Sequence, residues 1–360
     1  MTVRSPAMLT RRYAALGGAV LVAGLLGAVG LNYAVDPLQF LRRATYAPVF
    51  SDNQRYQNPG LARNYPYDTI VTGSSLMQAF LARDVEAALG GEVLRLPING
   101  SSAREHALLI ELAHRTGRLR RVIRDVHYNN LLAPADVTKG RRGGFPMHLY
   151  DDHRWNDLVY LANFETTALS LKVVLSLWGV LPLRPVPLDK LYTDVLRRPT
   201  GRDHVAASYR RVVASRPESD DRQANVVANI EVNYARLAES MPDVKFIYVF
   251  PPYSAAWYVA RLDTPGLGLE GFLAAKARFY AAMLAYPNVD IFDFQCREDF
   301  ALAFDEYRDV AHFSEAIARG MIADIADGRT RVTADTYQET IDCVPDLARR
   351  SAQAVRGLLD

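Results

Sequence analysis

The chain has 360 residues, of which 49% are hydrophobic and 23% are charged. This is the composition of a globular protein with a sizeable core, and it excludes the disordered, collagen-like and disulfide-scaffold classes. The 42 basic and 40 acidic residues leave a net charge of +2. Because so balanced a surface provides no field of one sign that would recruit nucleic acid, we expect no nucleic-acid partner.

No metal or cofactor is expected either. The two cysteines, Cys296 and Cys343, cannot form a four-thiolate zinc site, and the histidines show no HExxH or similar spacing. The stretch GLGLEG at 266–271 matches GxGxxG, but it follows Asp-Thr-Pro rather than a strand, so the context of a dinucleotide site is missing. The sequence does not decide whether the two cysteines pair.

The amino terminus carries an uncharged apolar run at residues 14–35. Its length is close to the ~20 residues that a helix needs to cross the hydrocarbon core of a bilayer. Three arginines precede the run and two follow it, and the positive-inside rule places the more basic flank in the cytoplasm. We predict a cytoplasmic segment at 1–13, a transmembrane anchor at 14–35 and the bulk of the chain outside the cytoplasm. The alternative is a cleaved signal peptide, for which the run is long and lacks a clean Ala-x-Ala site.

Strand-like and helix-like segments alternate after this anchor. Residues 36–66 are polar and proline-marked, which predicts an irregular stalk, and residues 67–130 form the first part of the main domain. YDTIVTG, EVLRLPI and RRVIRDVHY are predicted strands, and helical apolar spacing follows the first two of them. Such alternation predicts an α/β fold of three layers, α/β/α, with a mostly parallel sheet.

The alternation stops at residues 131–223, where long apolar helices such as NFETTALSLKVVLSLWGVL are joined by proline-rich and arginine-rich turns. We expect a helical insertion there that could cap a cleft. The second part of the domain, residues 224–330, contains the predicted strands VKFIYVFPP and VDIFDF with a helix around 272–284 between them. Residues 331–360 are expected to form a C-terminal helical tail.

The first candidate for chemistry is TGSS, Thr72 to Ser75, which lies after the first predicted strand and before a helix. In an open α/β sheet, ligands bind outside the carboxyl ends of the strands, and a helix amino terminus offers N–H groups to an oxyanion. A serine there suits acyl chemistry. The alternative is that Ser74 or Ser75 only caps the helix, which is a common role of serine.

The second candidate is YRDVAHFSEAIARGM, in which Asp309 and His312 lie three residues apart before an amphipathic helix. A serine nucleophile needs a base, and that base needs an acid to fix its tautomer. A short Asp-x-x-His turn supplies both, so the pair completes a possible triad. Alternatively, Asp309 or Ser314 caps the helix and His312 packs at its start.

GSS after the first strand, NGSS after the second and the late DxxH together resemble the SGNH, or GDSL-like, hydrolase superfamily, over roughly residues 60–325. More narrowly, the chain resembles its membrane-anchored bacterial branch, related to alginate O-acetyltransferases and to the D-alanyl transfer protein of teichoic acid modification, which carry GSS. This resemblance implies a flavodoxin-like arrangement of the sheet and a single-pass protein of the bacterial inner membrane that faces the periplasm.

The resemblance also implies roles for individual residues. The last residue of the first motif is the nucleophile of the family, which corresponds to Ser75, and the late acid and base correspond to Asp309 and His312. The glycine after the second strand, Gly100, corresponds to an oxyanion donor.

Two departures from the family pattern leave alternatives open. The Asn motif after the third strand reads VHYNN rather than Gly-x-Asn-Asp, so Asn129 is a second oxyanion donor in competition with His127 and Asn130. Ser74 stands where the hydrolases have Asp, so the sequence does not decide which of the two serines attacks.

We therefore expect a membrane-anchored serine esterase or O-acyltransferase that acts on a cell-envelope or exported polysaccharide. The resemblance implies a membrane protein that delivers the acyl donor, while the N-terminal helix contacts the lipid bilayer. An alternative of a different class is a catalytically silent SGNH-like domain that binds within a membrane complex. A secreted lipase is a further alternative.

Overall fold

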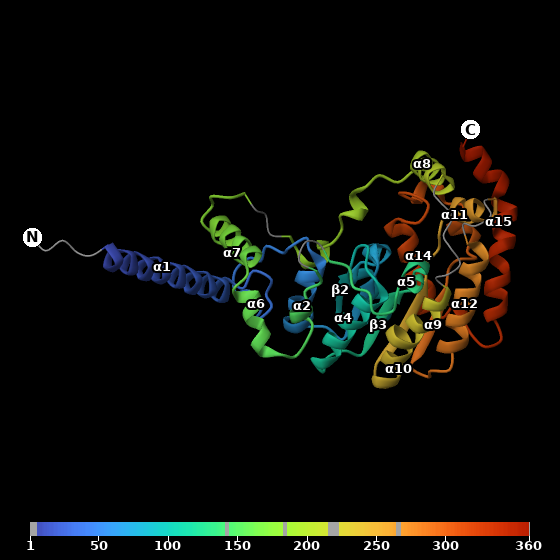
Figure 1. Cartoon of the computed structure of the whole chain (residues 1–360). Coiled ribbons are helices and arrows are strands. Elements are labelled where there is room, and N and C mark those ends of the chain that lie inside the picture. Colours follow the sequence, from blue (N-terminus) through green and yellow to red (C-terminus); the bar gives the residue numbers. More distant parts are fainter. Residues whose placement is uncertain (1–5, 141–143, 183–185, 215–222, 264–267, 360) are drawn as a thin grey trace, which may run out of the picture. The chain divides into compact units, whose positions relative to one another are not determined.

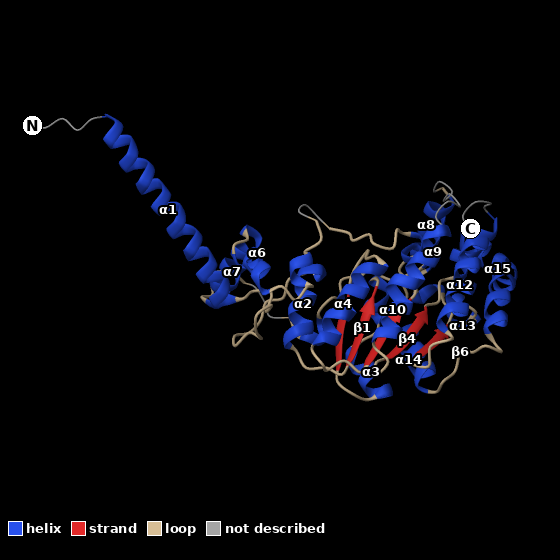
Figure 2. Cartoon of the chain, turned by 60° about the horizontal axis from the view of Figure 1, so that its bottom comes forward, coloured by secondary structure: helices blue, strands red, loops and turns tan. Residues whose placement is uncertain are grey.

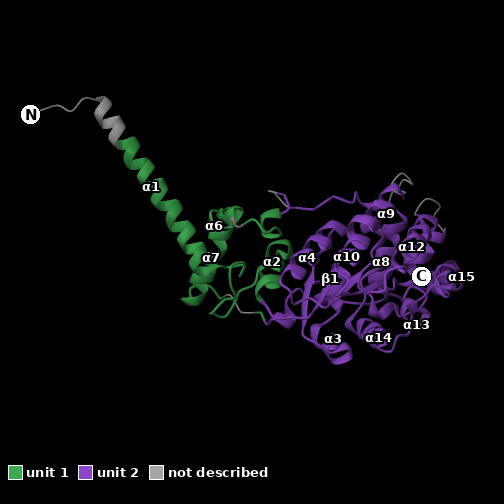
Figure 3. Cartoon of the chain, turned by 90° about the horizontal axis from the view of Figure 1, so that it is seen from below, with its two compact units in different colours: residues 1–64, 146–186 green, residues 65–145, 187–360 purple. Residues whose placement is uncertain are grey.

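The computed structural model describes residues 6–140, 144–182, 186–214, 223–263 and 268–359. By its internal contacts the chain divides into two compact units, residues 1–64 with 146–186 and residues 65–145 with 187–360 (Figure 3). The stretch 131–223, expected as one helical insertion, therefore contributes to both units. The first two residues of the GLGLEG motif, 266 and 267, lie outside the described residues.

The larger unit is built on a six-stranded sheet with the strand order β2-β1-β3-β4-β5-β6 (Figure 1). Strands β1 to β5 are parallel, and β6 pairs with β5 in the antiparallel direction. The predicted α/β fold with a mostly parallel sheet is confirmed. The strands are β1 (Thr69–Gly73), β2 (Val93–Pro97), β3 (Arg121–Asp125), β4 (Lys245–Phe250), β5 (Val289–Asp293) and β6 (Arg331–Val332).

Helices cover both faces of this sheet. The first five strands are almost wholly buried, as expected of parallel strands that read as β-branched and aromatic runs. Figure 2 shows α4 (Ala103–Arg115), α10 (Arg236–Ser240) and α12 (Leu269–Met283) on one face, and α3 (Ala82–Leu89) and α14 (Glu315–Ala326) on the other. The larger unit thus has the three layers that the alternation predicts.

The remaining helices of this unit join or flank those layers. They are η1 (Ser75–Ala79), α5 (Tyr128–Leu132), η4 (Leu188–Lys190), η5 (Val195–Arg197), α8 (Arg202–Val213), α9 (Gln223–Ile230), the π-helical turn η7 (Glu231–Ala235), α11 (Ala255–Asp263), α13 (Glu298–Ala301), η8 (Phe304–Glu306) and α15 (Tyr337–Leu359).

The smaller unit is helical and includes the apolar run. Its helices are α1 (Pro6–Val35), α2 (Gln54–Asn64), η2 (Met147–Leu149), η3 (Arg154–Asn156), α6 (Asp157–Leu161) and α7 (Phe164–Leu177). Within α1, the segment Tyr13–Val35 is long and apolar enough to cross a membrane. By length and composition alone, a signal sequence fits the same segment.

The irregular structure expected throughout residues 36–66 is wrong for α2, which is a helix despite an internal proline, Pro59. Proline lacks the N–H that would reach the carbonyl four residues earlier. That carbonyl belongs to Arg55, and it accepts a 2.8 Å hydrogen bond from the hydroxyl of Tyr150 instead. A side chain distant in sequence thus replaces the bond that the proline removes.

The expected helical tail begins with a short strand, β6, before α15. A disulfide between Cys296 and Cys343 joins α15 to the segment after β5, with the two Cα atoms 6.0 Å apart. Beside it, the buried ammonium of Lys276 donates to the Thr340 carbonyl (2.7 Å) and pairs with Asp293 (2.5 Å). Burial lowers the pKa of Lys276, and Asp293 opposes that shift. The C-terminal helix is therefore held both covalently and by a buried ion pair.

Reduction of this disulfide should destabilise the larger unit. The bond closes a loop of 47 residues, and a cross-link of this span contributes about 2–4 kcal/mol to the free energy of unfolding. Urea unfolding with and without reductant measures the loss. The matched control is the Cys296→Ser, Cys343→Ser chain, in which reductant should change nothing; an equal effect of reductant on both proteins would contradict the expectation.

Candidate active site

The strand order places the candidate motifs at one edge of the sheet. The chain passes from β1 to β2 on one side and then to β3 on the other, and ligands of doubly wound sheets bind at the carboxyl edge where the order reverses in this way. GSS ends β1, Gly100 lies in the turn after β2, and the segment 127–130 follows β3. The structure therefore places three of the predicted motifs around the switch point.

Ser75, His312 and Asp309 form a continuous line of hydrogen bonds. The Oγ atom of Ser75 lies 2.8 Å from Nε2 of His312, and Nδ1 of His312 lies 2.7 Å from Oδ2 of Asp309. Ser75 is half-buried, and the side chains of His312 and Asp309 are 24% and 23% exposed. The structure thus brings together three residues that the sequence separates by up to 237 positions, and solvent still reaches them.

The loop that carries Asp309 and His312 is braced from within and from outside. Oδ1 of Asp309 accepts hydrogen bonds from the backbone N–H groups of Ala311 and His312, both at 2.8 Å. Ser254, which follows β4, donates its backbone N–H (3.0 Å) and its hydroxyl (3.1 Å) to the carbonyl of Val310. These bonds fix the imidazole relative to the edge of the sheet.

Asp309 is held in its ionised form. Burial alone would raise its pKa, but the hydrogen bonds and positive charge of His312, with the backbone N–H of Ala311, lower the pKa to about 2. A carboxylate that stays charged opposite Nδ1 favours the tautomer of His312 in which Nε2 is free to accept the proton of Ser75.

Ser74 has a different environment from Ser75. Its hydroxyl donates to Oδ2 of Asp125 and accepts the N–H of Leu76 (3.2 Å), so that it caps η1, and its backbone N–H donates to Oδ1 of Asp125 (2.8 Å). Ser74 is buried. Ser75, and not Ser74, is the serine that faces His312.

Asp125, at the end of β3, organises this turn. Burial raises its pKa, and the two hydrogen bonds from Ser74 oppose that shift. Gly73 has a φ of +131°, and a Cβ at this position would collide with the Asp125 carboxylate. The first motif therefore needs glycine at position 73, and both the N–H and the hydroxyl of Ser74 are bound to Asp125. Asp125 belongs to none of the predicted motifs, although a carboxylate at the end of a buried strand is a signal that the sequence carries.

The two expected oxyanion donors follow the two strands that pair with β1. Gly100 has a left-handed φ of +57° in the turn after β2, and Asn129 is exposed in the first turn of α5, after β3. Asn130 is buried, and within the described residues its Nδ2 atom has no hydrogen-bond partner. The structure therefore does not decide between Asn129 and Asn130 as the side-chain donor to an oxyanion.

His127 is not suited to proton transfer near neutral pH. Burial lowers its pKa to about 4, and the nearby positive charges of His312, Arg261 and Lys139 add to the shift. Its ring packs edge-on against Tyr253, with centroids 6.2 Å apart. His127 is therefore a neutral neighbour of the line formed by Ser75, His312 and Asp309.

The aromatic run after β4 is packed inside the unit. Tyr253 stacks on Trp257 at 4.4 Å, and both side chains are at most 7% exposed. Because these two rings are buried, they close the loop after β4 and do not present a surface on which a sugar could stack. It also places Ser254 where it holds the His312 loop.

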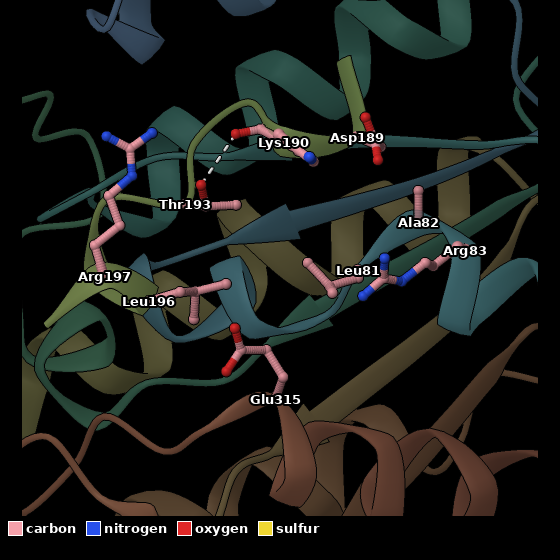
Figure 4. Close-up of a pocket in the computed structure, with 9 residues that line it drawn as sticks. All are labelled: Leu81, Ala82, Arg83, Asp189, Lys190, Thr193, Leu196, Arg197 and Glu315. Atoms are coloured by element: carbon pink, nitrogen blue, oxygen red, sulfur yellow. Dashed lines mark hydrogen bonds between the residues drawn. The ribbon is translucent and has the colours of Figure 1, made fainter. Parts of the chain in front are cut away.

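A cavity of about 240 Å³ lies between the start of α3, the segment 189–197 and the start of α14. Figure 4 shows Arg83, Lys190, Arg197, Asp189 and Glu315 around it. Ser75, His312 and Asp309 are not among the described residues that line it. Glu315 follows His312 by three positions, so the cavity borders the helix that the DxxH loop precedes.

Comparisons with known proteins add little to this geometry. No family model matches the chain, and no curated protein matches its sequence. Among solved structures, a Bacteroides fragilis protein provisionally described as an acylhydrolase aligns with 79% of this chain and 99% of its own, at 10% identity and a TM-score of 0.36. So distant a likeness carries no argument about the site, which rests on the contacts described above.

Replacing Ser74 by Ala should destabilise the protein. The change removes a cap and a hydroxyl donor to a buried carboxylate, which costs about 1–3 kcal/mol, while Ser75 and His312 keep their contact. Urea unfolding measures the loss. The exposed Ser240→Ala is the control, and a Ser74→Ala protein as stable as that control would contradict the role of Ser74 in this turn.

Stability in acid should depend on Asp309. Its pKa is about 2 in the folded chain, below the ordinary aspartate value of 3.8. A lowered folded-state pKa means that the carboxylate stabilises the fold above the higher value, and that this contribution is lost as the pH falls through the lower one. The advantage of the parent protein over Asp309→Asn at pH 5 should therefore shrink between about pH 4 and pH 2.

Urea midpoints at successive pH values measure that difference. The exposed Asp335→Asn provides the control, for which we expect no comparable convergence with the parent. An advantage over Asp309→Asn that persists unchanged down to the lowest pH would show that Asp309 is not held in its ionised form.

Proposed function

We propose that this chain is a serine esterase or O-acyltransferase in which Ser75 is the nucleophile. The observation that carries the proposal is the line of hydrogen bonds from Ser75 through His312 to Asp309, at 2.8 and 2.7 Å, on the carboxyl edge of the sheet. Both distances lie within the range that nucleophile, base and orienting acid require.

The reaction proceeds in two halves. Oγ of Ser75 attacks the acyl carbon of an ester while Nε2 of His312 takes the serine proton, and the tetrahedral intermediate collapses when the imidazolium returns that proton to the leaving alcohol. The acceptor hydroxyl then loses its proton to Nε2 of His312 and attacks the acyl carbon of the acyl-enzyme. The second tetrahedral intermediate collapses when the imidazolium returns that proton to Oγ, which releases Ser75 and the acylated product. Asp309 remains ionised throughout and holds Nδ1–H of His312.

The developing oxyanion needs donors at the same edge. The backbone N–H of Gly100 is one, and the side-chain amide of Asn129 is the other; the buried and unpartnered Nδ2 of Asn130 makes that residue its competitor. One such donor is worth ~10²–10³ in kcat, so the pair matters to the rate as much as the base does.

The acceptor distinguishes an esterase from a transferase. Water gives hydrolysis, and a sugar hydroxyl gives acyl transfer. The resemblance to alginate O-acetyltransferases and to the D-alanyl transfer protein supports transfer to a cell-envelope or exported polysaccharide, with the acyl donor delivered by a membrane partner. The Cys296–Cys343 disulfide supports an oxidising compartment such as the periplasm.

Contacts at the end of α1 support a retained inner-membrane anchor over a cleaved signal. The side chain of Asn32 is fully buried and bonds with Thr167 (2.9 Å) and Ser170 (2.8 Å), and the Asp36 carboxylate accepts the Tyr160 hydroxyl (2.7 Å). Removal of the segment that holds Asn32 would leave these buried polar groups unsatisfied, at a cost in stability.

Ser75→Ala should lower the hydrolysis of p-nitrophenyl acetate by about 10³-fold or more, because it removes the nucleophile. It should also abolish labelling by a fluorophosphonate probe. The measurement uses the full chain in detergent, with Ser240→Ala as the matched control that retains both signals.

The other outcomes are equally informative. Loss of labelling in Ser74→Ala but not in Ser75→Ala would move the nucleophile to the other serine. A folded parent protein that neither hydrolyses the ester nor takes the label would sink the enzyme proposal and favour a catalytically silent binding subunit.

A further inference from the structure

The segment 155–180 of the smaller unit, which runs from η3 through α6 and α7, carries large exposed apolar side chains. Trp155 is 90% exposed, Phe164 is 86% and Trp178 is 75%, while Leu171, Leu177 and Val180 are between 49% and 63% exposed. We call these six residues the α6–α7 surface. Large apolar side chains so exposed, and gathered on one short stretch of chain, mark an interaction site.

Helix α7 meets α1 through polar groups. The Asn32 amide donates to the Leu161 carbonyl (2.7 Å) and to the Thr167 hydroxyl (2.9 Å), and its oxygen accepts the Ser170 hydroxyl (2.8 Å). Asn32 and Ser170 are fully buried. Helices in water bury their apolar face, whereas α7 buries Thr166 and Ser170 as well as Val173. It exposes Phe164, Leu171 and Leu177. Polar groups between helices and apolar groups outward are the arrangement that lipid favours.

The length of α7 indicates the depth at which this helix fits a lipid bilayer. Its 14 residues span about 21 Å, which is too short to cross a bilayer and fits an interfacial segment. Tryptophan concentrates at the boundary between headgroups and acyl chains. The exposed side chains of Glu165 and Lys172 also suit this boundary, because their charged groups reach water there. The helix is therefore suited to lie at the interface rather than in the hydrocarbon centre.

The position of this surface along α1 agrees with that depth. Figure 1 shows α6 and α7 beside the C-terminal end of α1, and their anchor, Asn32, lies three residues before the end of the segment that can span a membrane, Tyr13–Val35. At that end the Arg42 guanidinium donates to the carbonyls of Tyr33 (2.5 Å) and Ala34 (2.8 Å). A cation there suits the anionic headgroups of a bilayer.

We propose that the α6–α7 surface is embedded in the interfacial region of the lipid bilayer, as a second membrane contact beside α1. The occupant of this surface is lipid, and the inserted segment 146–186 is a membrane element of the smaller unit. This role does not depend on whether the larger unit is an enzyme.

Quenching of tryptophan emission by brominated lipid tests the proposal. The chain has three tryptophans, and the third, Trp257, is buried in the larger unit. The full Trp257→Phe chain, in vesicles of phosphatidylcholine and phosphatidylglycerol brominated near the headgroup end of the acyl chain, should lose at least half of the emission that it has in unbrominated vesicles. Bromine near the chain terminus should quench it less.

The matched control is the full Trp155→Phe, Trp178→Phe chain, whose remaining Trp257 should be unaffected by bromine. The parent protein provides the same comparison if either variant fails to fold, because bromine should quench only two of its three tryptophans. Leu171→Glu with Leu177→Glu should reduce the quenching of Trp178.

Emission from Trp155 and Trp178 that bromine does not change would overturn the proposal. If these residues were then also protected from aqueous acrylamide, the surface would be covered by protein, either a second copy or a partner. If acrylamide quenched them fully, the surface would lie in water.

Discussion

The hydrogen bonds between Asp125 and Ser74 are the constraint on which the candidate site depends. The carboxylate at the end of β3 accepts hydrogen bonds from both the backbone N–H and the hydroxyl of Ser74, which follows β1. The neighbouring strands β1 and β3 are therefore joined next to Ser75. Gly73 leaves room for that carboxylate. With Ser74 turned inward and buried, Ser75 is the residue that reaches His312. A buried acceptor without these donors would be costly, so the geometry of the turn and the stability of the sheet are coupled.

The position of the loop that carries Asp309 and His312 depends on β4, the strand next to β3 in the sheet. Ser254, after β4, holds the carbonyl of Val310, and Asp309 folds back on the backbone of its own loop. The imidazole is thus oriented by its carboxylate and by a loop that the sheet supports. Pre-organisation of this kind is what general-base chemistry requires, because the base must already lie within hydrogen-bond reach of the nucleophile.

Helices α1 and α7 of the smaller unit pack together differently from the helices and strands of the larger unit. The larger unit buries aromatic and β-branched side chains around a parallel sheet, whereas α1 and α7 bury Asn32, Thr166 and Ser170 as well as Val173, and expose phenylalanine and leucine. A polar group buried between helices keeps its partners in any solvent, but the exposed apolar face is stable only where water is replaced by lipid or protein. The two units therefore call for different environments.

Local pattern in the sequence determined the five parallel strands, several of the long helices, the apolar segment long enough to span a membrane and the two motifs that meet in the site, because periodicity and turn residues act over a few positions. Contacts between distant residues decided the rest. Asp125, 51 positions from Ser74, settles which serine faces His312, and Tyr150 preserves α2 across Pro59. The tertiary structure also decided that Cys296 pairs with Cys343 and that the stretch 131–223 is divided between the two units. Both depend on which distant segments the folded chain brings together, and neighbouring residues in the sequence do not determine that.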